Sequence, residues 1–185
     1  HCREGRMAYA LGEGAFSYVS AGEMKLENGA SCSQKLDLPS GHYHGLVVTL
    51  DPEQASRSLP NVMAGFSVTP AAILRRFALN KMPKVIACTE RVAHIFEEMY
   101  RVPEKARISY FQIKILELLL ALDSMTPPKE NAAHPYFYKT QLEKTKAVRD
   151  FLAEHISENF TQEELSARFD FALTPMKTCF KAAYG

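Results

Sequence analysis

The feature that most constrains the fold of this chain is a helix start at Thr161. Thr161 and Glu164 form a T-x-x-E capping box, in which each side chain accepts a hydrogen bond from an otherwise unpaired backbone N–H. Phe160 and Leu165 flank the cap at the spacing of a hydrophobic staple. The pattern predicts a short helix that runs from Thr161 to about Phe169.

A second short helix is predicted after a tight turn. Asp170-Phe171-Ala172 supplies the turn, because Asp tolerates the left-handed backbone conformation that such turns demand. The helix begins near Leu173 or Thr174, with Pro175 early enough that its missing N–H costs little. Its buried stripe is expected to be Met176, Cys179 and Phe180. Its outward side is then polar and cationic: Thr174, Lys177, Thr178 and Lys181.

A longer amphipathic helix precedes this pair. Between Lys139 and Ile156 apolar residues recur at helical spacing. A long helix followed by two short helices across a tight turn is the layout of a helix-turn-helix DNA reader. The alternative is an ordinary three-helix segment without DNA. The net charge of this segment does not favour DNA binding. Residues 136–185 contain seven Lys and Arg residues in total and seven Asp and Glu residues in total.

The amino-acid sequence of this segment resembles that of a known family. The run EELSARFDFALTPMKTCFKAAYG, with its closing FKAAYG, is similar to the first helix-turn-helix of the AraC/XylS family of bacterial regulators. YFYKTQLEKTKAVRDFLAEH resembles the entry helix of the same module, in the PchR-like subgroup. SGHYHGLVVTLD and YFQIKILELLLAL extend a more diffuse similarity over most of the remaining chain. Asp170 and Ala172 depart from the family's usual turn glycine and small polar residue.

The resemblance implies a homeodomain-like module with two helix-turn-helix units, of which this sequence contains the first half. We therefore expect the chain, which starts at His1 without Met, to be a piece of a longer protein. The resemblance places Thr174, Lys177 and Thr178 at base edges in the DNA major groove. Lys181 and the N–H groups at helix starts would contact phosphates.

Residues 1–51 are predicted to be a β domain. Short apolar runs at 16–19, 24–26, 32–36 and 43–50 are separated by turn signals, of which Asn28-Gly29 is the strongest hairpin signal. The resemblance implies that this region is part of a cupin-like domain that senses a small effector. The aromatic candidates for the effector pocket are Tyr9, Phe16, Tyr18 and Tyr43. Aromatic residues on strands are also common core residues, so this alternative stays open.

His42 and His44 support a different hypothesis, a cupin metalloenzyme. Two histidines at i, i+2 on one strand are typical of a metal-binding cupin. A usable site needs three or four convergent ligands, and the Glu and distant His of that pattern do not stand in register here. We therefore predict no metal, no cofactor and no enzymatic activity.

Residues 52–125 are predicted to be helical. Asp51-Pro52 and Thr69-Pro70 each combine an N-cap with a proline at the first helical position, and Thr89 is a third N-cap. A long helix is expected from about Glu104 to Ser124. One of its stripes has the spacing of a coiled-coil seam, and the resemblance implies that it forms a homodimer interface: Ile108, Phe111, Ile115, Leu118 and Leu122. The alternative is a helix at the centre of a monomeric core.

The whole chain is thus predicted to be an α+β protein. A partial cupin-like domain (1–51), a helical dimerisation region (52–125), a linker (126–135) and a helix-turn-helix subdomain (136–185) follow in order. No apolar run is long enough to cross a membrane, and the spacing of the four cysteines suits free thiols of the cytoplasm. The predicted function is an effector-controlled transcription regulator that binds promoter DNA. A ligand-sensing or protein-interaction module without DNA binding is the remaining alternative.

Overall fold

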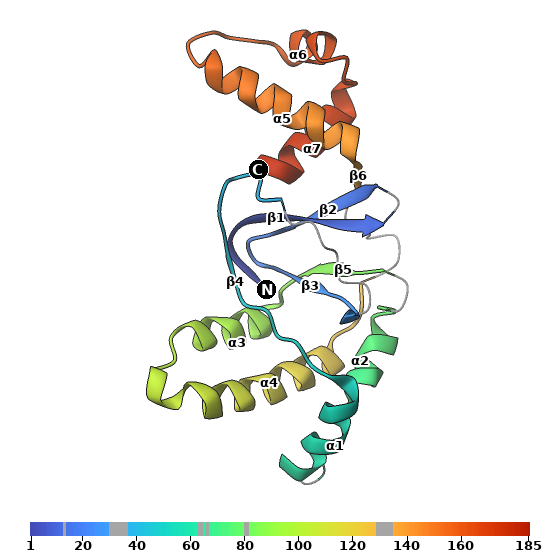
Figure 1. The fold of residues 1–185 in the computed structure, drawn as a ribbon, viewed down its shortest axis with the longest axis vertical. Coiled ribbons are helices and arrows are strands. Elements are labelled where there is room, and N and C mark those ends of the chain that lie inside the picture. The colour runs from blue at the N-terminus through green and yellow to red at the C-terminus, as the bar shows by residue number, and fades with distance from the viewer. Residues whose placement is uncertain (13, 30–36, 63–64, 66, 80–81, 129–134) are drawn as a thin grey trace. The chain divides into compact units, whose positions relative to one another are not determined.

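The protein is an α+β chain, described by a computed structural model except at residues 13, 30–36, 63–64, 66, 80–81 and 129–134 (Figure 1). It divides into two compact units. Unit 1 contains His1–Arg3, Ala21–Cys32 and Gly45–Ala133, and unit 2 contains Glu4–Ser20, Ser33–His44 and His134–Gly185. These units cut across the expected boundaries, because residues 4–20 and 33–44 cluster with the C-terminal helices, whereas the other residues of 1–51 belong to unit 1.

Unit 1 combines a small sheet with most of the predicted helices. Strands β3 (Glu23–Leu26) and β5 (Lys84–Ala87) pair antiparallel, with Met24 opposite Ile86. Around them lie α1 (Pro52–Val62), α2 (Pro70–Arg76), α3 (Glu90–Tyr100), the short 3-10 helix η2 (Glu104–Ala106) and α4 (Arg107–Ser124). The core joins Phe77, Val92 and Ile95 to Leu118 and Leu122. Its apolar burial is the main source of stability of this unit.

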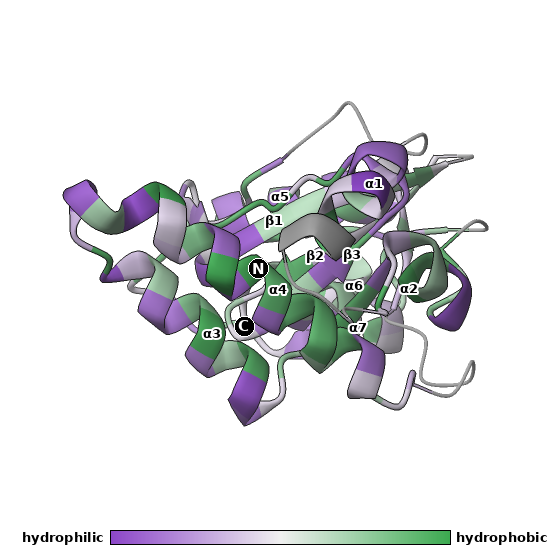
Figure 2. Ribbon diagram, turned by 90° about the horizontal axis from the view of Figure 1, so that it is seen from below, coloured by the Kyte–Doolittle hydropathy of each residue, from purple (hydrophilic) through white to green (hydrophobic). Residues whose placement is uncertain are grey.

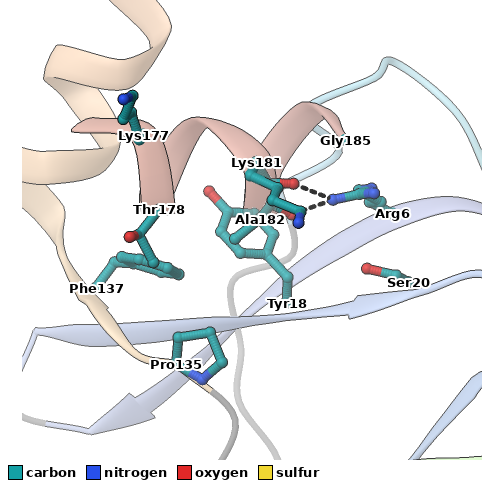
Figure 3. A pocket seen from close by; sticks show the side chains of 10 residues that line it. All are labelled: Arg6, Tyr18, Ser20, Pro135, Phe137, Lys177, Thr178, Lys181, Ala182 and Gly185. Carbon is teal, nitrogen blue, oxygen red and sulfur yellow. Dashed lines mark hydrogen bonds between the residues drawn. The ribbon is translucent and has the colours of Figure 1, made fainter. Parts of the chain in front are cut away.

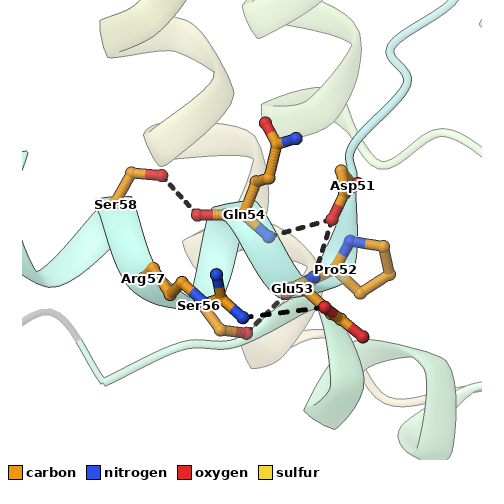
Figure 4. Close-up of polar contacts among 7 residues, drawn as sticks. All are labelled: Asp51, Pro52, Glu53, Gln54, Ser56, Arg57 and Ser58. Carbon is orange, nitrogen blue, oxygen red and sulfur yellow. Dashed lines mark hydrogen bonds and ion pairs between the residues drawn. The ribbon is translucent and has the colours of Figure 1, made fainter.

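The three predicted helix starts in unit 1 are confirmed. Asp51 Oδ1 accepts hydrogen bonds of 2.9 Å from the backbone N of both Glu53 and Gln54, at the start of α1 (Figure 4). Thr69 Oγ1 accepts from Ala72 N at 3.2 Å, and Thr89 caps α3 in the same way. Each contact satisfies a backbone donor that the helix itself leaves unpaired.

Several strand predictions differ from the structure. Residues 46–50 are not a strand, since β4 covers only Tyr43–Gly45. The segment after Asp51 is not purely helical, because β5 lies within it. The described partner of β3 is β5, and the residues after the Asn28-Gly29 hairpin signal lie outside the described part of the chain. The whole predicted 32–36 strand and most of the 126–135 linker lie outside it too.

Helix α4 buries much of the stripe that was expected to form a dimer interface. Leu118 and Leu122 are 6% and 5% exposed in the core of unit 1, and Phe111 and Ile115 pack against that core. Ile108 alone of the five is largely exposed. Figure 2 shows hydrophilic and hydrophobic residues in turn along α3 and α4, as amphipathic helices require. The exposed apolar residues of α4 are Ile108, Ile113 and Leu120.

Unit 2 joins a sheet to the three C-terminal helices. Its strands are β1 (Cys2–Gly12, of which residues 4–12 belong to this unit), β2 (Ala15–Ser20) and β6 (Phe137–Tyr138), with β4 at the edge in the order β4-β1-β2-β6. The β1–β2 pair is antiparallel, and β6 adds to β2 with Phe16 opposite Phe137. The helices are α5 (Lys139–Glu154), α6 (Gln162–Arg168) and α7 (Leu173–Tyr184).

One core holds the sheet and helices of unit 2 together. Ala8, Tyr18 and Phe137 of the sheet belong to the same buried cluster as Val148 of α5 and Met176 of α7. The helices therefore do not form an isolated bundle, because the sheet closes their apolar side. Among the described residues, no helix combines the length and apolar character needed to cross a membrane.

Candidate nucleic-acid interface

The two sides of α7 differ sharply in burial. Met176, Cys179 and Ala183 are 5%, 0% and 1% exposed. Thr174, Lys177, Thr178 and Lys181, the predicted outward residues, are all exposed. Phe180 is only partly buried. Because α7 contains no Asp or Glu, its outward face is cationic over the whole length of the helix.

The position of α7 depends on the local structure that precedes it. The capping box at α6 is complete, since Thr161 N donates to Glu164 Oε2 at 2.7 Å and Glu164 N donates to Thr161 Oγ1 at 3.2 Å. The hydrogen bond from Thr161 N, followed by the interaction with the Thr161 side chain, lowers the pKa of Glu164 and favours its charged form. The negative carboxylate also complements the N-terminal end of the α6 dipole. Phe160 and Leu165 lie in the same apolar cluster, as a staple requires.

The turn between α6 and α7 has the predicted left-handed residue. Asp170 has a φ of 45°, and it is one of two non-glycine residues with positive φ in the described chain. Ser166 Oγ donates to Phe171 O at 2.7 Å, and Phe171 N donates to Ser166 O at 3.0 Å. Lys144 of α5 contacts Asp170 at both its carboxylate and its carbonyl oxygen. The turn is thus fixed by its own backbone and by α5.

The C-terminal end of α7 is held by a residue of β1. Arg6 Nη1 donates hydrogen bonds of 2.6 Å to the carbonyl oxygens of Lys181 and Ala182. The last carbonyl groups of a helix carry partial negative charge, and Lys181 O also accepts a hydrogen bond of 3.0 Å from Gly185 N. A guanidinium group complements this charge, and its two hydrogen bonds connect the C-terminal end of α7 to β1.

A pocket of about 430 Å³ lies beside the outward face of α7 (Figure 3). Its helix side consists of Lys177, Thr178, Lys181 and Ala182, together with the adjacent Gly185. Its sheet side consists of Arg6, Tyr18, Ser20, Pro135 and Phe137. In Figure 3, Tyr18 rises from β2 toward α7, and Phe137 lies below Thr178. Three of the four predicted DNA-contacting residues therefore also line a pocket.

The four effector candidates have different surroundings. Tyr18 lines the pocket, whereas Tyr9, Phe16 and Tyr43 are not among its lining residues. Tyr9 is 1% exposed, and Phe16 and Tyr43 are partly buried. Tyr18 and Phe137 are both aromatic, but the sequence predicted only Tyr18 as a residue of the effector pocket. Arg6 and Phe137 were missed because no local pattern relates residues 6 and 137 to α7.

His42 and His44 are both exposed. His44 Nδ1 lies 3.9 Å from Glu4 Oε1. Within the described part of the chain, no group of three or more His, Cys, Asp or Glu residues is placed to hold a metal ion. Among those residues, no third metal ligand accompanies His42 and His44, as the metalloenzyme hypothesis would require.

No protein-family model, curated protein or solved structure matches this chain. A function for this chain is therefore argued from the geometry of α6 and α7.

Proposed function

We propose that this chain is a sequence-specific DNA-binding transcription regulator of AraC type, with α6 and α7 as its helix-turn-helix. The observation that carries the proposal is the outward face of α7. Thr174, Lys177, Thr178 and Lys181 are exposed on a helix whose opposite side is buried and whose sequence contains no carboxylate. A recognition helix needs this combination of a fixed back and a polar, cationic front.

The residues of this face suit different parts of DNA. Lys177 can donate to the N7 and O6 acceptors of guanine, while Thr174 and Thr178 can contact a thymine methyl or use their hydroxyl groups. Thr178 Oγ1 already donates to Thr174 O at 2.9 Å, which leaves its lone pairs to accept from a base. Lys181, near the end of α7, is assigned to a phosphate.

Residues outside α7 would have supporting roles in this proposal. The strands would belong to a cupin-like sensor of a small effector, and exposed apolar residues of α4 would contribute to a homodimer. An effector can control DNA binding only if it binds the DNA-competent and the free form with different affinities. One helix pair reads a single major-groove segment, so we expect weaker binding than the roughly 10⁻⁸–10⁻¹¹ M of complete regulators.

The test is selection from a randomised duplex library with the 185-residue protein at low salt, followed by fluorescence anisotropy on the enriched duplex. Lys177→Ala should weaken binding about 10-fold, as expected for loss of a base contact. Lys181→Ala should weaken binding to all duplexes by the same factor. It should also reduce the magnitude of the slope of log K against log salt concentration by about one.

Lys105→Ala is the matched control, because Lys105 is an exposed lysine of unit 1. It removes the same charge without touching α7. Failure to enrich any duplex, or equal effects of Lys177→Ala and Lys105→Ala, would overturn the proposed function. The protein-interaction alternative would then be preferred.

A further inference from the structure

The pocket beside α7 has the size of a small-molecule site. Its volume of about 430 Å³ falls within the roughly 300–1,000 Å³ typical of such sites. It lies entirely within unit 2, with residues of β1, β2 and β6 on one side and of α7 on the other. Any molecule held there touches the sheet and the proposed recognition helix together.

The charge of the pocket selects an anion. Arg6 and Lys181 line it, and none of its ten lining residues is Asp or Glu, although Gly185, which carries the terminal carboxylate of the 185-residue protein, lines it beside Arg6. Lys177 is also a lining residue, but its side chain points away from Tyr18 and Phe137 in Figure 3. Among the described residues, none of these three cations forms an ion pair with a carboxylate. Arg6 uses Nη1 for the carbonyl groups of α7, and its Nε and Nη2 make no further hydrogen bond in that part of the chain. A guanidinium group with two free donors on one edge matches a carboxylate.

The sheet side of the pocket contains two aromatic side chains. The rings of Tyr18 and Phe137 lie with centroids 5.9 Å apart, and each residue is only 4% exposed. The Tyr18 hydroxyl makes no hydrogen bond within the described chain, so it is available to a ligand. Burial raises the pKa of Tyr18 and keeps this hydroxyl protonated, so it serves as a donor. Aromatic rings beside a few convergent polar groups are typical of ligand sites.

We propose that this pocket binds a small organic carboxylate with a flat apolar body. The carboxylate lies against Arg6 and Lys181, and the apolar body lies against Tyr18 and Phe137. A ligand in this position covers Thr178 and Lys181, so it excludes DNA from the same face of α7. The binding site stands independently of DNA, whereas the exclusion of DNA rests on the proposed function.

The ligand and DNA are therefore coupled through shared residues and not through a distant rearrangement. Because binding free energies are reciprocal, the carboxylate weakens DNA binding by the same factor by which DNA weakens carboxylate binding. Such a regulator is released from DNA when its ligand accumulates.

The first test measures ligand binding without DNA. 2-Naphthoate is titrated into the 185-residue protein by isothermal calorimetry, with 2-naphthamide as its uncharged counterpart. We expect a dissociation constant on the order of 1 mM or tighter for the carboxylate, given its number of atoms. The amide should bind at least about 10-fold more weakly, because it lacks the charge-assisted hydrogen bonds.

The site is located by variants and by NMR chemical shifts. Arg6→Gln and Lys181→Gln should each weaken naphthoate binding about 10-fold, as expected for removal of one charged donor. Lys181 is exposed, and its side chain forms no hydrogen bond or ion pair within the described chain, so its substitution tests the site even if Arg6→Gln alters the fold. Backbone shifts should concentrate at Tyr18, Phe137 and Thr178.

Lys146→Gln is the matched control. Lys146 lines a second pocket of about 310 Å³ in the same unit, which is bounded by α5, residues 37–39 and the end of α7 and shares only Tyr18 with the first pocket. The proposal predicts unchanged naphthoate affinity in this variant. Absence of naphthoate binding, equal binding of the amide, or a loss caused by Lys146→Gln but not by Lys181→Gln would each overturn the site.

A DNA arm separates the two proposals. Saturating naphthoate should weaken binding of the selected duplex at least about 10-fold, since both use Lys181. If naphthoate binds at this pocket but no duplex is ever bound, the ligand site stands and the regulator proposal fails. If both bind without affecting each other, the inferred exclusion is wrong.

Discussion

At the scale of single residues, Glu164 connects the chemistry of a helix start to the geometry of α7. Its carboxylate accepts a 2.7 Å hydrogen bond from Thr161 N, and this contact lowers its pKa. A folded-state pKa below the unfolded value adds stability at higher pH. That contribution is complete above the ordinary glutamate value of 4.5 and is lost as the pH falls through the lowered folded value.

The Glu164→Gln variant should lose this pH dependence. Glutamine keeps an oxygen that accepts from Thr161 N, but it does not titrate. Urea unfolding between neutral pH and about pH 3 should show the wild type falling toward the variant below about pH 4.5. Glu163→Gln is the control, since it removes the same charge from the same turn without the capping contact. Identical pH profiles for both variants would contradict this role of Glu164.

At the scale of elements, α4 shows how an apolar stripe acquires its partner. The seam spacing from Ile108 to Leu122 was compatible with a dimer or with a monomeric core. The structure places Leu118 and Leu122 in the core of unit 1 and leaves Ile113 62% exposed. Ile113, Leu116 and Leu120 form a second apolar stripe in the sequence, of which Leu116 is buried and the other two are exposed. The spacing of the two stripes alone could not show which of these residues would be buried.

Leu118→Ala should therefore reduce the stability of the protein much more than Ile113→Ala. Leu118→Ala is expected to reduce the free energy of unfolding by about 3 kcal/mol, because it removes buried methyl groups and leaves a cavity. Ile113→Ala should change it by no more than about 0.5 kcal/mol. Urea denaturation monitored by circular dichroism measures both. A Leu118→Ala protein that stays as stable but dissociates from dimer to monomer would instead assign Leu118 to an interface.

At the scale of the whole molecule, the two units have separate cores. The cluster around Phe77 and Val92 belongs to unit 1, and the cluster around Val148 and Cys179 belongs to unit 2. Separate cores favour unfolding in separate steps. Among the described residues, one fully buried cysteine lies in each unit, Cys2 in unit 1 and Cys179 in unit 2.

Thiol labelling in urea should report each unit through its own cysteine. Leu118→Ala should lower the urea concentration at the midpoint of Cys2 labelling by on the order of 1 M. Leu165→Ala should lower the midpoint of Cys179 labelling by a similar amount. Each variant should move the other midpoint much less. Mass spectrometry of labelled peptides distinguishes these two sites from Cys88, whose thiol has a pKa raised to about 11 by burial. Equal shifts of both midpoints would show a single cooperative unit.

Sequence alone determined the features that depend on neighbouring residues. The caps at Asp51, Thr69, Thr89 and Thr161 and the left-handed Asp170 all follow from contacts within a few positions, where side-chain chemistry limits the backbone directly. Tertiary structure decided the pairing of β3 with β5, the addition of β6 to β2, and the contact of Arg6 with the end of α7. Arg6 and Lys181 are 175 positions apart, and only the packing of a shared core brings such residues together. The outward face of α7 was thus predictable, whereas the pocket beside it was not.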